Sequence, residues 1–354
     1  MSVFTFGETM VALRGDGQLK LGGTMAVSVA GAESNVAIGL ARLGHPVDWA
    51  GAVGADEAGE LVLRTLRAEG VDVTGAVRDG TAPTGLLLFE PRLPGVTRVH
   101  YYRAGSAGSR IAADDVERAF TAFLEAGSAA PATPVEAGTA TPATRVGAGS
   151  AAHATRGGTG TAPRVLHLTG ITPALSPSAR SAAERAMELA AENDVLISLD
   201  VNFRARLWST EEAAAVMRDW APRADVLIAS DDELPLCLPA GSPDDPALRA
   251  EALLEAGAGE VVVKLGAAGA TAYTLQGELH APARTVPAVD PVGAGDAFVA
   301  GYLSALLDGS DTAERLDRAV TTGAFAVAAS GDWEGAPTRA ELGLLGAAPG
   351  TVVR

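Results

Sequence analysis

The sequence predicts an α/β protein with a doubly wound, mostly parallel sheet, helices on both faces and a small β-sheet lid. Three observations support this fold class. Short runs rich in Val, Ile and Leu alternate along the chain with segments rich in Ala, Leu, Glu and Arg. Most of the apolar runs are continuous, which is typical of strands buried on both faces of a parallel sheet. Two segments, 8–30 and 84–103, look like strands without intervening helices, and we expect them to form the lid.

The predicted strands and helices follow one another in the order that such a sheet requires. The strands are predicted at 2–7, 46–54, 164–170, 194–202, 225–230 and 260–266. The helices are predicted at 33–43, 57–69, 177–192, 210–220, 246–256 and 296–308. Within the lid, 84–103 has the pattern of a hairpin that turns near 92–98. A chain of 354 residues can bury one large core, so we predict a single domain over 1–354.

One segment, 127–162, does not fit this alternation. Thirty of its 36 residues are Ala, Thr, Gly, Pro or Ser, and its few apolar residues show no periodicity. Such a composition buries too little apolar surface to offset the entropy of ordering the chain. We therefore predict a low-complexity, flexible insertion at the surface.

Composition excludes several classes of function. The 43 acidic residues outnumber the 27 basic ones and give a net charge of −16, which argues against binding to nucleic acids or to membrane surfaces. The single cysteine, Cys237, permits no disulfide within the chain and lies in an apolar run typical of a core residue. We see neither a secretory signal nor an apolar stretch long enough to span a membrane. We expect a cytoplasmic protein.

Glycine and polar residues gather where the predicted strands end. In open α/β sheets, ligands bind beyond the carboxyl ends of the strands. The residues that follow the strands are Gly7 and Glu8, 51–56, Gly170, 202–204, 230–233, Gly266 and the approach to Gly293. The agreement between several strands predicts a site along this edge of the sheet.

The stretch VDPVGAGDAFVAGYL, 289–303, places three small residues before Asp296 at the start of an apolar helix. It is not a dinucleotide fingerprint, because Phe298 occupies the position of the third glycine, and neither lysine of the chain fits a Walker A loop. The remaining interpretation is an anion hole, formed by the free N–H groups of 293–296 and aided by the helix dipole. Asp296 would act there as a base, or it would only cap the helix. These residues alone leave both readings open.

A second glycine-rich stretch, VAGAESNVAIGLARLG, occupies 29–44. It predicts a tight turn over 30–33, followed by a helix with Asn35 in its first turn. An amide offers both a donor and an acceptor to a polyol, although a capping role would also explain it.

Together, these two stretches resemble the signatures of the ribokinase (PfkB) family of carbohydrate kinases, and the likeness is closest to its 2-keto-3-deoxygluconate kinases. The resemblance covers nearly the whole chain except 127–162. Its matching segments are 7–13, 31–44, 98–110, 166–177, 198–208, 289–298 and 331–342. It implies a ribokinase-like fold and ATP-dependent phosphorylation of the C6 hydroxyl of a 2-keto-3-deoxy sugar acid, 2-dehydro-3-deoxygluconate.

The resemblance also implies roles for individual residues. The implied catalytic group is Asp296 as base, with Gly293, Ala294 and Gly295 completing the anion hole. The implied sugar ligands are Gly31 and Asn35 for the hydroxyls, and Tyr101, Arg103 and Arg204 for the acid end. The implied nucleotide ligands are Ser230, Lys264, Gly266 and Gly269 together with Gly293 and Gly295, and Glu233 is implied near Mg²⁺. ATP and Mg²⁺ are the implied cofactors, with a monovalent cation beside the anion hole, and relatives commonly form homo-oligomers.

Three departures from the family pattern concern ligand contacts. The first is that RAVTTGA, 318–324, lacks the Asn that the family often carries before GA near the adenine. Ser230 stands where the wider family often has Asn, and Leu87 stands where close relatives tend to have Tyr. Leu87 weakens the argument that the substrate is 2-keto-3-deoxygluconate rather than its galactonate epimer. Two alternatives stay open: a fructokinase- or ribokinase-like kinase of a neutral sugar, and a non-catalytic sugar or nucleotide sensor. The pair Arg103 and Arg204 favours an acidic substrate, because a carboxylate bound to a chain of net charge −16 needs guanidinium partners.

Overall fold

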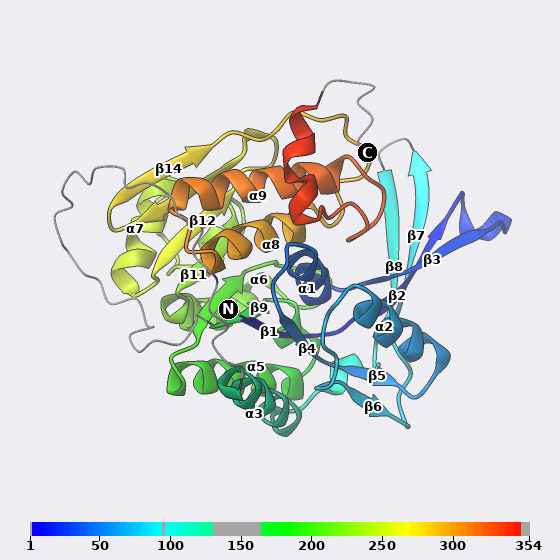
Figure 1. The fold of residues 1–354 in the computed structure, drawn as a ribbon. Helices are drawn as coiled ribbons and strands as arrows, with labels where there is room; N and C mark the ends of the chain where they lie inside the picture. The colour runs from blue at the N-terminus through cyan, green and yellow to red at the C-terminus, as the bar shows by residue number, and fades with distance from the viewer. Residues whose placement is uncertain (1, 94–95, 130–163, 348–354) are drawn as a thin grey trace, which may run out of the picture.

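The computed structural model describes residues 2–93, 96–129 and 164–347, and it confirms the predicted α/β fold (Figure 1). The main sheet has eight strands in the order β14-β13-β12-β11-β10-β9-β1-β4. The strands from β12 to β4 are parallel, whereas β13 and β14 are antiparallel to their neighbours. The strand bounds are β1 Ser2–Phe6, β4 Val47–Ala50, β9 Arg164–Thr169, β10 Leu196–Asp200, β11 Val226–Ser230, β12 Glu260–Lys264, β13 Ala270–Thr274 and β14 Gly277–Ala281.

Helices cover both faces of this sheet, and each face has its own apolar core. One core includes residues of α1, α2, α8 and α9, and the other includes residues of α3, α5, α6 and α7. Successive residues of a central strand enter opposite cores: Ile228 lies in the first, and Leu227 and Ala229 lie in the second. Burial on both faces is why these strands have continuous apolar sequences. The helices are α1 Ala32–Arg42, α2 Glu57–Ala68, α3 Ala113–Ala129, α4 Thr172–Leu175, α5 Pro177–Glu192, α6 Thr210–Trp220, α7 Pro246–Ala256, α8 Ala294–Leu307 and α9 Thr312–Val327.

The segments predicted to form a lid make a separate four-stranded sheet in the order β3-β2-β7-β8. The strands are β2 Met10–Gly15, β3 Met25–Ala30, β7 Leu86–Leu93 and β8 Val96–Tyr102. Its buried side chains include Met10, Leu87 and Phe89, and they pack against Val292 from the loop before α8. Through this contact the small sheet lies beside the glycine-rich stretch 293–296 (Figure 1).

The structure corrects three predicted boundaries and adds a hairpin. The predicted strand 46–54 is two strands, because the chain breaks at Gly51; its second part, β5 Ala52–Gly54, pairs with β6 Val77–Asp79. The predicted helix 296–308 begins earlier, at Ala294, because Gly293 serves as its N-cap. Helix α3 includes the first three residues of the predicted insertion, and 130–162 lies outside the described residues. The β13–β14 hairpin was not predicted.

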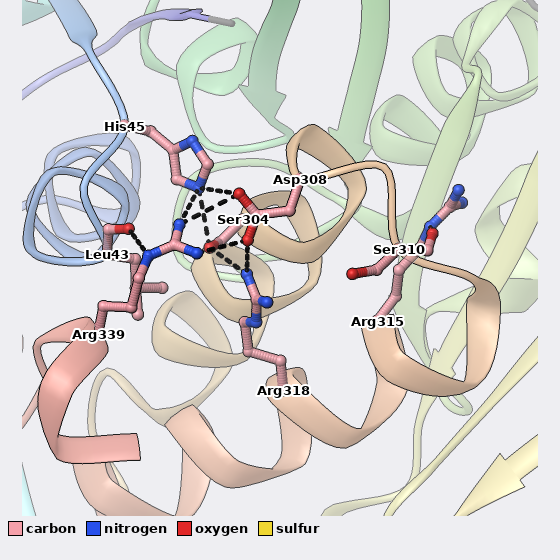
Figure 2. A network of polar contacts seen from close by, with 8 residues as sticks. All are labelled: Leu43, His45, Ser304, Asp308, Ser310, Arg315, Arg318 and Arg339. Atoms are coloured by element: carbon pink, nitrogen blue, oxygen red, sulfur yellow. Dashed lines mark hydrogen bonds and ion pairs between the residues drawn. The ribbon is translucent and has the colours of Figure 1, made fainter. Parts of the chain in front are cut away.

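A polar network fixes the segment after α9 to the rest of the domain (Figure 2). Arg318 of α9 and Arg339 of the 3₁₀ helix Arg339–Gly346 both donate to the carboxylate of Asp308, at 2.5 and 2.6 Å. Arg339 also donates to the carbonyl of Leu43 at 2.7 Å and lies 3.0 Å from His45 Nε2. Burial lowers the pKa of His45, so a neutral ring accepts this bond. The network joins α1, α8, α9 and the final 3₁₀ helix.

Two expectations from composition can be compared with the structure. Cys237 is 3% exposed, and burial raises the pKa of its thiol to about 12, as expected for a core residue rather than a nucleophile. Among the described residues, no helix combines the length and the apolar character needed to cross a membrane.

Candidate active site

The site forms where the strand order of the main sheet reverses. Strand β1 lies between β4 and β9, and the chain leaves β1 at Gly7. Glu33, in the first turn of α1, accepts hydrogen bonds from Thr169 Oγ1 at 2.6 Å and Thr172 Oγ1 at 2.7 Å, just beyond the end of β9. Only a glycine at position 7 leaves room for this carboxyl, because a Cβ there would lie 2.5 Å from Glu33 Cδ. These contacts hold the start of α1 at the position where α/β proteins bind ligands.

Asn35 and Asp296 meet across this site. The two residues lie 261 positions apart in the sequence, and Asn35 Nδ2 donates to Asp296 Oδ2 at 2.7 Å. Burial raises the pKa of the Asp296 carboxyl to about 7, against the hydrogen bond from Asn35, which lowers it. Oδ1 of Asn35 is buried without a hydrogen-bond partner among the described residues. A carboxyl with a pKa near neutrality and an unused amide oxygen are features of a functional site.

The turn before α8 requires glycine at position 293. Gly293 has φ +75°, and a Cβ there would lie 1.7 Å from the carbonyl oxygen of Asp332. Its conformation lets α8 begin at Ala294. The first N–H groups of α8 point toward this turn, because the first N–H groups of any helix have no partner within the helix. The N–H of Ala294 donates to Pro291 at 3.3 Å, so it is less free than the sequence predicted. A Cβ at Gly295 would lie in van der Waals contact with Lys264 Nζ, at 3.9 Å.

Lys264, whose side chain is 18% exposed, and the buried Asp200 form an ion pair in front of this turn. Lys264 Nζ lies 2.8 Å from Asp200 Oδ1, at the carboxyl ends of β12 and β10. Burial alone would lower the pKa of Lys264, but Asp200, Glu233 and Asp296 raise it above its ordinary value. The lysine therefore stays charged and faces the helix start with a positive group. Sequence reasoning placed Lys264 near the nucleotide but did not identify Asp200 as its partner.

Arg103 lies at the edge of the small sheet with a partner that the sequence did not predict. Its Nε donates to Glu8 Oε2 at 2.6 Å, and Nη2 lies 2.5 Å from the same oxygen. Ser106 Oγ donates to the other oxygen of Glu8, which is 3% exposed. Tyr101 lies beside this pair, with the Arg103 guanidinium 5.8 Å from its ring centroid. The charge of Arg103 is thus balanced by a buried carboxylate.

Arg204 is exposed, and its Nη1 donates to the carbonyl of its neighbour Phe203 at 3.1 Å. It lies close enough to Asp296 to lower the pKa of that carboxyl. Another residue of this loop, Arg206, donates to the carbonyl of Val99 at 2.8 Å. Arg206 joins the loop after β10 to the small sheet, and it was not singled out from the sequence.

Glu233 binds backbone amides in the structure. One carboxylate oxygen accepts from the N–H of Phe203 at 2.7 Å and the other from the N–H of Ser230 at 2.9 Å. These bonds join the loops after β10 and β11. No cluster of three or more His, Cys, Asp or Glu side chains within the described ranges could hold a metal ion.

Gly266 and Gly269 shape the turn that connects β12 to β13. They have φ +56° and +103°, conformations that favour glycine. A Cβ at Gly269 would lie 2.0 Å from the carbonyl oxygen of Ala281 on the neighbouring hairpin strand. The backbone conformation of this turn therefore explains why glycine stands at both positions. The turn lies at the same edge of the sheet as Lys264.

The structure brings the predicted residues into two groups. Asn35, Asp296, Lys264 and Arg204 interact around the start of α8. Tyr101 and Arg103 lie with Glu8 at the small sheet. Two buried acids, Glu33 and Asp200, were not singled out from the sequence, and Glu8 was noted only for its place after the first predicted strand. All three acids stand inside segments that match the family. Glu8 directly follows the first predicted strand, Asp200 lies within the predicted strand 194–202, and Glu33 ends the predicted turn 30–33.

Comparison with known proteins agrees with this arrangement. The model of the pfkB family carbohydrate kinases matches residues 1–130 and 161–339. A protein of Bacillus subtilis (strain 168) named 2-dehydro-3-deoxygluconokinase is 33% identical over 97% of this chain and 94% of its own length. One of the same name from Thermoproteus tenax is 32% identical over 96% and 93%. The crystal structure of a PfkB protein from Polaromonas sp. JS666 is 33% identical, with a TM-score of 0.77 over 97% of this chain and 99% of that one.

Proposed function

The chain belongs to the pfkB family of carbohydrate kinases, and we propose that it transfers the γ-phosphate of ATP to the C6 hydroxyl of 2-dehydro-3-deoxygluconate. The observation that carries this proposal is the Asp296 carboxyl. It has a pKa of about 7, accepts a hydrogen bond from Asn35 and lies in the first turn of α8. The names of the two relatives support the choice of substrate.

Asp296 acts as the general base in this proposal. A base works best when its pKa is close to the working pH, because it is then deprotonated and still basic enough to accept a proton. Asn35 holds the carboxylate from one side, and its free amide oxygen offers an acceptor to a sugar hydroxyl. The carbonyl of Gly31 already accepts from the N–H of Asn35 at 2.7 Å and from Ser34 Oγ at 3.0 Å, so it is not a free acceptor. The C6 hydroxyl gives its proton to Asp296 as its oxygen attacks the γ-phosphorus in line with the leaving ADP.

Backbone amides and Lys264 stabilise the charge that develops on the transferred phosphoryl group. The N–H groups of 293–296 lie at the positive end of the α8 dipole. Lys264 adds a positive charge close to Gly295. These groups are in place before the reaction, so they stabilise the transition state without reorganising.

The nucleotide lies along the carboxyl ends of β11 and β12 in this proposal, near Ser230, Gly266 and Gly269. Mg²⁺ keeps most of its ligands as phosphate oxygens and water and needs only one or two carboxylates. Glu233 suits such a site because each oxygen has one backbone donor and further acceptor capacity. The metal would neutralise phosphate charge.

The substrate carboxylate is assigned to Arg103, Tyr101 and Arg204. Arg103 directs Nε and Nη2 toward Glu8, so the Nη1 edge remains for a ligand. Tyr101 and Arg103 lie at the small sheet and Arg204 on the loop after β10, which supports a sugar site between the two sheets in this proposal. Exclusion of water from the phosphoryl group follows when the small sheet covers it.

One observation favours the second candidate, a kinase of a neutral sugar. Glu8 already balances the charge of Arg103, so this arginine is not an unpaired cation awaiting a carboxylate. Leu87 is buried on β7, opposite Tyr101 in the β7–β8 register, and its side chain offers no hydrogen bond to an acid. The sensor alternative has no such support, because a protein that only binds a ligand does not need a base with a pKa near 7.

A coupled assay of ADP release distinguishes these functions. The enzyme is given ATP, Mg²⁺ and one of 2-dehydro-3-deoxygluconate, its galactonate epimer, fructose or ribose. The proposal predicts that kcat/KM for a 2-keto-3-deoxy acid exceeds that for either neutral sugar by at least a hundredfold. Preference for fructose or ribose would support the second candidate, and binding without turnover of any sugar would support a sensor.

We also expect a homo-oligomer. The small sheet exposes apolar side chains that a monomer would leave in water, Val27 at 60%, Val96 at 52% and Tyr102 at 61% exposed. Light scattering of the purified chain would give its mass, and a mass close to the 35.6 kDa of one chain would contradict this expectation.

A further inference from the structure

Arg14 of strand β2 extends from the small sheet to the turn before α8. Its guanidinium lies 3.9 Å from the centroid of the Phe89 ring, on the neighbouring strand β7. Nη1 lies 3.2 Å from Asp290 Oδ2, and Nη2 lies 2.5 Å from Asp332 Oδ2. These contacts hold the cation between an aromatic ring and two carboxylates, and they leave the side chain of Arg14 only 18% exposed.

The two carboxylates flank the proposed anion hole. Asp290 precedes Gly293 by three residues, and its Oδ1 accepts from the N–H of Val292 at 3.1 Å. The backbone of Asp332 packs directly against Gly293. Two negative charges at this place would oppose the binding of a polyphosphate unless a cation neutralises them.

The loop that carries Asp332 is firmly held. Arg42 at the end of α1 donates through Nη1 to the carbonyls of Trp333 and Glu334, at 3.2 and 3.1 Å, and to that of Ala336 at 2.7 Å. Trp333 Nε1 in turn donates to the carbonyl of Val29 on β3 at 3.0 Å. The carboxylate of Asp332 therefore has a defined position relative to the small sheet, and in that position it forms an ion pair with Arg14.

We propose that Arg14 is a positioning residue whose guanidinium is the fixed cation of the phosphate site, so that this kinase needs no monovalent cation. The family resemblance implied such an ion beside the anion hole. In this chain Oδ2 of Asp290 and Oδ2 of Asp332 already bind the Arg14 guanidinium, and Oδ1 of Asp290 binds a backbone amide. The proposal rests on the assignment of 293–296 as the anion hole.

The first test uses the wild-type protein. Calorimetry measures the Kd of Mg²⁺-ATP, and the coupled assay measures turnover, in chloride salts of potassium, sodium and tetramethylammonium at equal ionic strength. Tetramethylammonium is too large to enter a site for a bare ion. We expect each quantity to vary by less than twofold between the salts. A tenfold or greater loss in tetramethylammonium would overturn the proposal.

The second test uses Arg14→Ala and Arg14→Lys, with Arg98→Ala as the control on the same sheet. Arg98 is 56% exposed and lies 3.9 Å from its acidic partner, Glu90. In tetramethylammonium, we expect Arg14→Ala to weaken Mg²⁺-ATP binding at least tenfold, and potassium or guanidinium to restore most of it. Arg14→Lys keeps a cation and should remain independent of the salt, like the control.

Other outcomes also decide the question. Arg14→Ala could lose affinity for Mg²⁺-ATP in a way that neither ion restores, and Arg14→Lys could show the same loss. This result would show that only the shape of the side chain matters, and it would overturn the proposal. If Arg14→Ala fails to fold, which a melting curve reveals, the wild-type salt series and Arg14→Lys still give the answer. ATP binding needs no sugar, so an error in the proposed sugar substrate would leave this test intact.

Discussion

The pH dependence of turnover should report the protonation of Asp296. Only the deprotonated carboxylate can accept the proton of the sugar hydroxyl. Burial raises the pKa of this group to about 7, so its deprotonated fraction is high above pH 7 and decreases about tenfold for each pH unit well below it. The acid limb of kcat/KM should therefore have its midpoint near pH 7, well above the ordinary range of an aspartate.

Replacing Asn35 by Ala tests this assignment, because Asn35 donates to Asp296 Oδ2 at 2.7 Å and thereby lowers its pKa. A hydrogen bond to a charged group contributes about 1.5–3 kcal/mol. One pKa unit corresponds to about 1.4 kcal/mol. Loss of the bond should therefore move the acid limb of the profile upward by about one to two pH units.

The assay measures kcat/KM from pH 5 to 9.5 in constant ionic strength for the wild type, for Asn35→Ala and for Asn193→Ala. Asn193 is a matched amide outside the site, where its Nδ2 donates to the carbonyl of Leu189 at 2.8 Å. Its removal should leave the acid limb in place. Asn35→Ala should also raise the KM of the sugar, but that change alone does not move the limb. An unmoved or lowered limb in Asn35→Ala would refute the pairing of these residues.

Three further substitutions should separate structural from catalytic roles. Lys264→Met leaves the buried carboxylate of Asp200 without its cation, so the free energy of unfolding, measured in urea, should fall by about 3–5 kcal/mol. A loss below about 1 kcal/mol would contradict the pairing of Lys264 with Asp200. Gly293→Ala forces a side chain into a left-handed conformation against a facing carbonyl, which should cost about 1–3 kcal/mol and most of the turnover, as melting curves and the coupled assay would show. Arg103→Gln should raise the KM of a sugar acid by about 10–100-fold while leaving the KM of ATP unchanged; an equal effect on both would indicate that Arg103 only neutralises Glu8.

The fold could be predicted from sequence because its strands and helices have strong local patterns. The runs at 225–230 and 260–266 are continuous in Val, Ile and Leu because both faces of β11 and β12 are buried. The β13–β14 hairpin was missed because its second strand, GELHA, is largely exposed and lacks such a run. The break at Gly51 was missed because the pattern of 46–54 stays apolar across it, although the backbone turns into a different sheet there.

The candidate site could be located but not fully built from the sequence. Asn35 and Asp296 stand in recognisable glycine-rich stretches, and the roles proposed for them rest on the family resemblance. The partners of the charged residues depend on contacts between distant segments: Glu8 with Arg103, Asp200 with Lys264, and Arg14 with two acids more than 270 positions away. No local pattern encodes such pairs, because each charge taken alone has the appearance of a surface residue.

The most direct test of the account is a comparison of Asp296→Asn with the wild type in two measurements on the same preparations. The coupled assay gives kcat with 2-dehydro-3-deoxygluconate, and calorimetry gives the Kd of that sugar acid. The account predicts that kcat falls by about 10²–10⁴-fold, the usual contribution of a general base, while the Kd changes by less than about threefold. Equal losses in turnover and binding, or a kcat close to that of the wild type, would contradict the role of Asp296 as the base.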